Sequence, residues 1–427
     1  MHNSHARMSL AAYAVTVSLG LCPAIGQTVW YVDATATGGN NGTSWANAFV
    51  DLQDGLGAAG SIDQIWVAAG TYRPSADPAH ARTATFRLTG NVGLYGGFAG
   101  DEGSLDERDV EANETFLSGD FAGDDGPDFA NNGENSYHVV TVSDPGAAPA
   151  VDGFTITGGN ADETLYNHSG GGGMYIDAGS PTLINCTFRG NFAIRNGGGM
   201  YVVGERGGNI IVNISDCAFT ANRVEERVLP EESWGGGVSF VFAEAVLSGC
   251  TFSGNAAVGG NLGFGGGIAA SDSTLTLTDC SFVGNTADVT EGVYLYASAS
   301  GGGVYARKSA LTATDTTFSQ NSSRDSGSAC VAGDEGVVLT NCVFTGNAGR
   351  ACVLSGGIIE VTACTFSENS GGGLRTNGEE TRIADCVFSG NGNLDDTTGG
   401  GLSVRRRATV TGCSFVGNLA KVGGGLW

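Results

Sequence analysis

The chain has 427 residues, of which 72 are glycine, and it carries 44 acidic side chains against only 20 basic ones. The resulting formal net charge of −24 at pH 7 repels phosphate backbones and anionic lipid headgroups. Nucleic acid is therefore excluded as an expected partner, whereas cations and neutral or basic surfaces are favoured. Beyond the N-terminus no run reaches the roughly 18 apolar residues of a membrane-spanning helix, so we expect no transmembrane helix.

Residues 1–26 have the organisation of a secretory signal peptide. Arg7 precedes an apolar stretch from Leu10 to Leu21, and the small residues Ala24 and Gly26 follow. A basic residue, a short apolar run and small residues at the cleavage point are typical of exported proteins. We expect cleavage after Gly26 and a mature chain that is secreted, extracellular or held at an outer surface. The alternative for this stretch is a buried helix.

Residues 27–150 are expected to form an N-terminal cap and early, irregular coils. The segment SWANAFVDLQDGLGAAG places Phe49, Leu52 and Leu56 on one face of a short helix, with Ser44 as its N-cap. A helix at this position can cover the open end of a repeat core, as terminal caps do.

An acidic segment, GDFAGDDGPD, lies in the same region. Carboxylate oxygens on a flexible, anionic loop suit Ca²⁺, although the spacing is not that of an EF-hand or of a GGxGxD repeat. Weak binding of Ca²⁺, the one candidate cofactor, is therefore expected here, and the alternative is an ordinary exposed turn. The candidate metal ligands are Asp120, Asp124, Asp125 and Asp128.

Residues 151–427 repeat two marks, Cys-x-Phe-x-x-Asn and a glycine triplet followed by an apolar residue. The closest phenylalanines, Phe344, Phe366 and Phe388, recur every 22 residues, and a fixed period in this range indicates a solenoid. TTFSQN at Thr316 is the copy without cysteine. The other copies begin at Cys186, Cys217, Cys250, Cys280, Cys342, Cys364, Cys386 and Cys413.

The interior of each repeat indicates strands. LRTNGEETRIADCVFSGN, from Leu374, alternates short apolar positions with β-branched residues and contains no helical pattern, which excludes helical repeats. Cys386 and Phe388 are two residues apart and so share one side of a strand. Asn391 can adopt a left-handed turn and bond to its copy in the next coil, and the glycine triplet supplies another turn. The sequence therefore predicts an all-β, right-handed parallel β-helix with a short N-terminal capping helix.

Parallel coils lie about 4.8 Å apart, so equal residues stack on each other. We expect one continuous core from about Trp30 to Trp427, because a single repeat can bury its apolar face only against its neighbours. The phenylalanines expected inside it are Phe188, Phe219, Phe252, Phe282, Phe318, Phe344, Phe366, Phe388 and Phe415.

The 11 cysteines are interpreted mainly as buried thiols. Eight occupy the repeat column, and Cys330 and Cys352 share a second one. Side chains in a column run side by side, which is a poor start for the disulfide dihedral near 90°, and a one-dimensional column cannot supply a tetrahedral metal site. If any pair is oxidised, Cys330 with Cys352 is the candidate.

These marks carry two resemblances. FxxN alternating with GGG-apolar resembles the repeats of chlamydial polymorphic outer-membrane proteins. YVDATATGGNNGTSWANAFVDLQDGL, with IWVAAGTYRP, LYGGFAG, SLDERD and LSGD after it, resembles the start of bacterial secreted proteins with right-handed parallel β-helix repeats, in the pectate-lyase-like superfamily. Together they cover nearly all of residues 28–427, and they imply a bacterial surface or extracellular location. The fold hosts adhesins, lyases and hydrolases, so it does not choose among them.

Most variation in coil length falls between the asparagine and the next glycine triplet, so the insertions are expected at one corner. Aromatic faces beside carboxylates suit sugar rings, and the alternative is that these aromatics pack on the solenoid. The candidate ligand-binding residues are Tyr166, Trp234, Phe264, Tyr294, Tyr296, Glu231 and Glu232.

Two functions remain open. The first is an exported, non-catalytic β-helix protein used for adhesion, contact with a polysaccharide or cell-surface glycan, or structure. The second is a polysaccharide lyase or glycoside hydrolase acting on a loop-lined face. We identify no catalytic residue, because the basic run Arg405 to Arg407 has no carboxylate set tied to it by motif.

Overall fold

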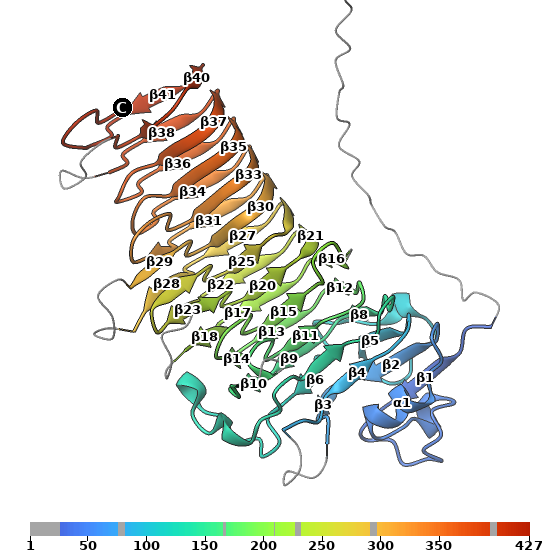
Figure 1. The fold of residues 1–427 in the computed structure, drawn as a ribbon. Helices are drawn as coiled ribbons and strands as arrows, with labels where there is room; N and C mark the ends of the chain where they lie inside the picture. Colours follow the sequence, from blue (N-terminus) through green and yellow to red (C-terminus); the bar gives the residue numbers. More distant parts are fainter. Residues whose placement is uncertain are drawn as a thin grey trace, which may run out of the picture.

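Short strands rich in β-branched residues stack coil upon coil into a right-handed parallel β-helix (Figure 1). The computed structural model describes residues 26–75, 82–164, 168–208, 210–226, 232–290, 297–392 and 399–427. The expected signal peptide lies outside these residues, except for Gly26. One apolar core runs from Val32 to Leu402, with Phe415 packed against its end, which confirms the continuous interior.

The strands belong to four sheets. Sheet A has 20 strands: β1 (Val29–Val32), β2 (Gln64–Ala68), β4 (Phe86–Leu88), β5 (Gly93–Phe98), β7 (Val140–Val142), β8 (Ala150–Asp152), β11 (Met174–Ile176), β12 (Thr182–Ile184), β15 (Met200–Val203), β16 (Ile210–Ser215), β20 (Val238–Val241), β21 (Ala243–Ser248), β25 (Ile268–Ser271), β26 (Thr274–Thr278), β30 (Val304–Thr314), β33 (Cys330–Thr340), β35 (Cys352–Thr362), β37 (Leu374–Ala384), β39 (Leu402–Val404) and β40 (Ala408–Thr411).

The other three sheets complete the coils. Sheet B has 12 strands: β3 (Gly70–Tyr72), β6 (Thr115–Ser118), β9 (Thr155–Thr157), β13 (Thr187–Arg189), β17 (Ala218–Thr220), β22 (Thr251–Ser253), β27 (Ser281–Val283), β31 (Thr317–Ser319), β34 (Val343–Thr345), β36 (Thr365–Ser367), β38 (Val387–Ser389) and β41 (Ser414–Val416). Sheet C has six: β10 (Asn160–Ala161), β14 (Phe192–Ala193), β18 (Arg223–Glu225), β23 (Ala256–Gly259), β28 (Thr286–Val289) and β32 (Ser322–Ser323). Sheet D has three: β19 (Glu232–Trp234), β24 (Leu262–Phe264) and β29 (Ser298–Ser300).

Sheet B carries the phenylalanine column. From Phe188 to Phe415 successive ring centroids are 4.7–5.0 Å apart and the rings are within 8° of parallel. The rings are fully buried as far as Phe388, and Phe415 at the last coil is half-buried. This confirms the predicted internal stack.

The asparagines form a second column inside the corner. From Asn191 to Asn391, each side-chain Nδ2 donates to Oδ1 of its copy one coil on, at 2.8–3.1 Å. The prediction of amide-to-amide bonds is therefore confirmed. The left-handed conformation, however, falls on the residue before each asparagine, for example Gln320 at φ 55° and Glu368 at φ 56°. The expectation that asparagine itself takes this conformation was wrong.

The glycine triplets make the corner that leads into sheet A. Gly235 has φ 69°, and a Cβ on Gly237 would lie 2.6 Å from the carbonyl oxygen of Gly267 in the next coil. Only glycine allows the backbones to approach this closely.

A short helix does cover the N-terminal coils. Helix α1 (Leu52–Ala58) buries Leu52, and Phe49 and Leu56 pack partly buried against the core. Its N-cap is Asp51, whose side chain accepts from the Gln53 backbone, and not Ser44, which precedes the 3-10 turn η1 (Trp45–Asn47) without a side-chain cap bond. The other 3-10 turns are η2 (Leu105–Glu107), η3 (Pro127–Phe129) and η4 (Asn132–Glu134).

Ten cysteines in the described residues are free thiols. Cys330 and Cys352 pair in register on β33 and β35, as expected, and both are free. In the described part of the chain, no helix is long and apolar enough to cross a bilayer.

Candidate functional site

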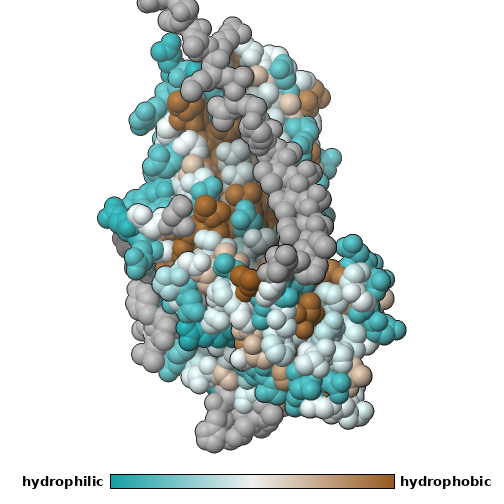
Figure 2. Space-filling model, turned by 90° about the vertical axis from the view of Figure 1, so that its right-hand side faces the viewer, coloured by the Kyte–Doolittle hydropathy of each residue, from teal (hydrophilic) through white to brown (hydrophobic). Residues whose placement is uncertain are grey.

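A groove runs along the bend of sheet A, on the outside of the solenoid. Its volume is about 510 Å³, and its lining residues come from the β15–β16 connection through β21, β26 and β30 to β33. These are five successive coils, so the groove extends about 19 Å along the axis at about 4.8 Å per step. Figure 2 shows the side of the molecule that lies at the right of Figure 1, where hydrophobic residues lie beside hydrophilic ones.

Left-handed residues at equivalent positions create this bend. Phe242, Asp272 and Lys308 occupy successive coils with φ of 52°, 50° and 49°. Beneath them the backbone N–H of Ser273 donates to Ser309 Oγ at 3.0 Å, which ties neighbouring coils together. The bend is therefore a regular feature of the backbone, repeated coil after coil.

The lining combines apolar and charged groups. Most of the charged side chains are exposed, whereas the apolar residues are buried or half-buried and form the floor together with the buried Ser273. Hydroxyl-bearing and charged groups above an apolar floor can hydrogen-bond and pack against a polar, extended molecule. The floor includes Ile210, Phe242, Ala243 and Ala310, and the walls include Arg206, Glu244, Asp272, Thr274, Lys308 and Glu335.

The predicted corner cluster is only partly described. Tyr166, Glu231, Tyr294 and Tyr296 lie outside the described residues. Trp234 and Phe264 end strands of sheet D and pair in register on neighbouring coils. Both are 8% exposed, so the structure brings them together but leaves little ring surface for a ligand.

These two rings pack on the outer face of sheet A. Tyr305 stacks on Phe264 with centroids 4.3 Å apart, and the Arg307 guanidinium lies 4.6 Å from the Trp234 ring centre. Trp234 Nε1 donates to Glu232 Oε2 at 2.8 Å. The carboxylate of Glu232, which was predicted to bind a ligand, is therefore already hydrogen-bonded within the protein. The geometry favours the alternative that the corner aromatics cover the solenoid.

Two histidines lie close together beside the same face. His138 Nδ1 donates to the Gly171 carbonyl oxygen at 2.9 Å, and its Nε2 shares a hydrogen bond of 3.2 Å with His168 Nδ1. Tyr175 stacks on His138 at 5.0 Å, and burial raises the pKa of Tyr175 to about 12. These contacts hold His138, His168 and Tyr175 together as one packed group.

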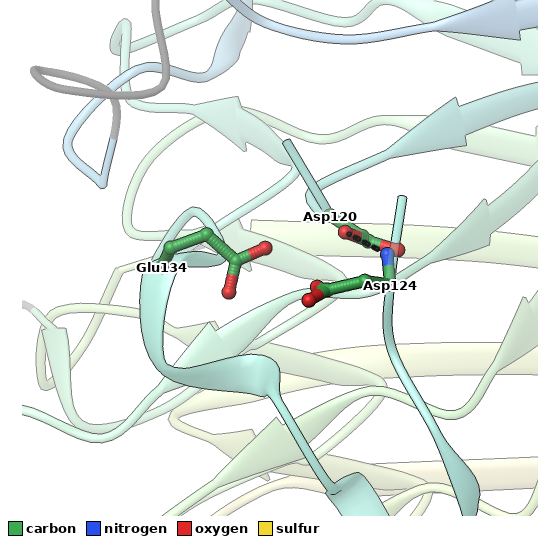
Figure 3. A group of neighbouring side chains, drawn as sticks. All are labelled: Asp120, Asp124 and Glu134. Atoms are coloured by element: carbon green, nitrogen blue, oxygen red, sulfur yellow. Dashed lines mark hydrogen bonds between the residues drawn. The ribbon is translucent and has the colours of Figure 1, made fainter. Parts of the chain in front are cut away.

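The acidic loop after β6 brings two of its four predicted ligands together (Figure 3). Asp120, Asp124 and Glu134 each offer a carboxylate oxygen, and these oxygens lie within 4.8 Å of one another. Asp128 is in the 3-10 turn η3 and does not belong to this group.

Asp125, the remaining predicted ligand, turns to a buried partner. Asn135 Nδ2 donates to its Oδ2 at 2.8 Å, although Asp125 as a whole residue is exposed. Partial burial of the carboxyl group, together with repulsion from Asp120, Glu134 and Asp124, raises the pKa of Asp125 to about 6. Asp125 is thus the carboxyl group of this loop whose ionisation the neighbouring charges oppose.

Sequence reasoning missed Glu134 and the groove residues. Glu134 belongs to the same loop but lies ten residues after Asp124, beyond the quoted acidic run. Phe242, Asp272 and Lys308 line the same groove but lie far apart in the sequence. Only an alignment of one coil on another, at the position after the paired Val241, Ser271 and Arg307, could have collected them.

The chain is similar to several solved structures at low sequence identity. No curated protein sequence matches the chain. Among solved structures, pectate lyase Pel9A is 11% identical, with 91% of this chain and 78% of that chain covered and a TM-score of 0.41. Tailspike protein 3 of bacteriophage CBA120 is 13% identical, with 90% and 51% covered and a TM-score of 0.42. The mannuronan C-5 epimerase AlgE4 A-module of Azotobacter vinelandii is 13% identical, with 88% and 92% covered and a TM-score of 0.32.

The family model described as "Right handed beta helix region" matches residues 128–301 and 266–427, which together make up more than half of the chain. The protein belongs to the right-handed β-helix family.

Proposed function

We propose that this chain is an exported, non-catalytic β-helix protein that binds an extended glycan in the groove along the bend of sheet A. The observation that carries the proposal is the groove itself, which stays open across five coils over about 19 Å. That length suits a short stretch of an extended polysaccharide better than a compact metabolite. The N-terminal segment and the repeats that resemble chlamydial surface proteins support a role outside the cell.

The charges of the lining indicate the class of glycan. The groove is lined by three acidic and two basic side chains, so its charge is close to neutral in an otherwise strongly acidic chain. The acidic residues are Glu244, Asp272 and Glu335, and the basic ones are Arg206 and Lys308. Carboxylates can accept from sugar hydroxyls, and the two cations can hold an occasional uronate. A neutral or weakly acidic polysaccharide therefore fits the groove.

The test is a binding screen of neutral and acidic polysaccharides, with depolymerisation measured in the same samples. For a glycan that binds, Lys308→Ala should weaken binding by about 1.5–3 kcal/mol, the scale of a hydrogen bond to a charged group. Lys421→Ala is the matched control, because Lys421 is equally exposed but lies in the last coil, away from the groove. Binding that is unaffected by Lys308→Ala, or no binding by any glycan, would overturn the proposal.

The enzymatic alternative rests on the same groove, where three carboxylates lie beside a lysine. A lyase needs a basic group to remove a proton beside a uronate, and a hydrolase needs a pair of carboxylates. Depolymerisation that is lost in both Glu244→Gln and Lys308→Ala would establish catalysis there. Binding without depolymerisation would support the non-catalytic assignment.

A further inference from the structure

We infer that Arg405, Arg406 and Arg407 form an anion-binding extension of the groove, which takes the carboxylate or sulfate groups of an acidic polysaccharide. The inference rests on the proposed function, because it names the class of glycan for the same bend of sheet A. The three arginines lie between β39 and β40, in the coil that follows β37. Strands β33, β35, β37 and β40 follow one another toward the C-terminal end of the solenoid (Figure 1).

The register of sheet A places the arginines in line with the groove. Strand β37 pairs with β39 up to Thr376 and with β40 from Thr381 on, so the arginine run lies opposite residues 377–380. Residues 355–358 of β35 lie in the coil before these, and Glu335 of β33 is the last residue that lines the groove. Three coil steps therefore separate Glu335 from the arginines, which is about 14 Å at about 4.8 Å per step. An extended chain that leaves the groove can reach them.

Two glycines keep the surface open between the groove and the arginines. Gly336 and Gly357 belong to neighbouring coils, on β33 and β35. A Cβ on Gly336 would lie 3.8 Å from the nearest atom, and one on Gly357 would lie 3.6 Å away, so both positions have room for a side chain. Neither glycine has a positive φ. Neither packing nor backbone conformation thus requires glycine here, and the lack of side chains leaves the backbone open to close approach by a ligand.

The arginines have no partner among the residues that the structure describes. All three are exposed, and no side-chain hydrogen bond or ion pair joins them to those residues. Arg108 and Arg382, in contrast, are paired with carboxylates. A guanidinium group can bind a carboxylate or a sulfate through two parallel hydrogen bonds, so free arginines on the line of the groove suit an anionic ligand.

The local charge favours an anion although the whole chain is acidic. Four of the chain's 20 basic side chains lie in residues 399–427, and none of its 44 acidic ones does. In the preceding coil Glu380 is held by Arg382 at 2.8 Å, so Glu379 is the carboxylate of residues 377–380 that is outside an ion pair. Charges more than about 8 Å away are largely screened at physiological ionic strength. The acidic remainder of the chain therefore opposes an anion at this place only weakly.

The test titrates the full chain by calorimetry with dextran, carboxymethyl-dextran and dextran sulfate, which share one backbone and differ in charge. We expect both anionic polymers to bind more tightly than dextran, and less tightly as NaCl is added. The triple variant Arg405→Gln, Arg406→Gln, Arg407→Gln should weaken their binding by roughly tenfold or more, the scale of hydrogen bonds to charged groups. Comparison of the two anionic polymers shows which of the two anions the arginines prefer.

The matched control removes three exposed cations elsewhere, in the triple variant Arg189→Gln, Arg324→Gln, Lys421→Gln. It has the same net charge as the arginine variant and should bind as the unmodified chain does. Arg406→Gln alone should cause part of the loss, and it replaces the arginine variant if the triple substitution impairs folding.

The outcomes separate this inference from the groove. Equal affinities of the two triple variants for the anionic polymers, or no binding of either polymer, would overturn the inference, while a neutral glycan whose binding depends on Lys308 would still support the groove. Loss of affinity in the arginine variant, without any effect of Lys308→Ala on any glycan, would support the arginine site and overturn the groove.

Discussion

Two regions of the molecule complete the same solenoid in different ways. One is the set of coils between Cys342 and Asn391, and the other is the loop from residue 119 to 136. In the coils, each 22-residue step repeats its neighbour, and every buried amide of the asparagine column meets an identical amide above and below. In the loop, the chain leaves β6, makes the turns η3 and η4 and returns without a copy beside it. Oδ1 of its buried Asn135 has no hydrogen-bond partner within the part of the chain that the structure describes.

A repeated coil therefore gives its buried polar side chains hydrogen-bond partners, whereas an irregular loop can leave buried polar atoms without one. A stacked residue finds its partner in the next coil as a direct result of the period. A single inserted loop must find partners of its own. The glycan groove, in contrast, uses a regular bend with varied side chains.

The largest expected effect is on the regular coils. Phe366→Ala removes a fully buried ring that stacks 4.7 Å from Phe344 and 4.9 Å from Phe388. It should lower the free energy of unfolding by about 3–5 kcal/mol, measured by chemical denaturation. Val387→Ala, on the outer side of the next coil and 40% exposed, is the control and should have little effect. An unchanged midpoint for Phe366→Ala would contradict the inward stack.

The two asparagine environments can be compared directly. Asn369 accepts from the Asn347 backbone and side chain and donates to the Phe344 carbonyl, so Asn369→Ala leaves several buried groups unpaired. It should cost about 2–3 kcal/mol, whereas Asn135→Ala, which loses one hydrogen bond to Asp125, should cost about 1 kcal/mol or less. Equal losses in denaturant titrations would show that the column has no advantage over the loop.

The contrast also explains what the sequence could reveal. The strands, the phenylalanine column and the glycine corners were predictable because Phe366 and its copies recur at a regular spacing, which fixes their place in each coil. The acidic loop was found as a local run, but Glu134 was missed because only the return of the chain brings it to Asp124. The groove was not found, since Phe242, Asp272 and Lys308 share a position in the coil but differ in chemistry.

Substitution of Trp234 tests whether the corner beside sheet D binds a glycan or packs on the solenoid. The sequence predicts a glycan-binding ring there, whereas the structure packs it with Phe264 at 4.9 Å and Tyr305 at 5.5 Å. Trp234→Ala should then lower stability by about 2 kcal/mol and leave glycan affinity unchanged, while Trp234→Phe should retain most of the stability. Loss of glycan affinity at full stability would restore the corner as the binding site.

The smallest effect is expected from the thiols of the regular coils. Nine of the ten described cysteines are buried, and Cys413, in the last full repeat, is only half-buried. Burial raises the pKa of the Cys352 thiol, which keeps it from forming the reactive thiolate. In the mature chain expected after cleavage at Gly26, a thiol reagent should therefore label one cysteine quickly in the folded state, Cys413, and all ten described cysteines after denaturation. Cys413→Ser should remove the fast reaction, and a reducing agent should leave the unfolding midpoint unchanged. A regular column with most of its thiols oxidised after purification would contradict the interpretation of these cysteines as buried, unbridged packing residues.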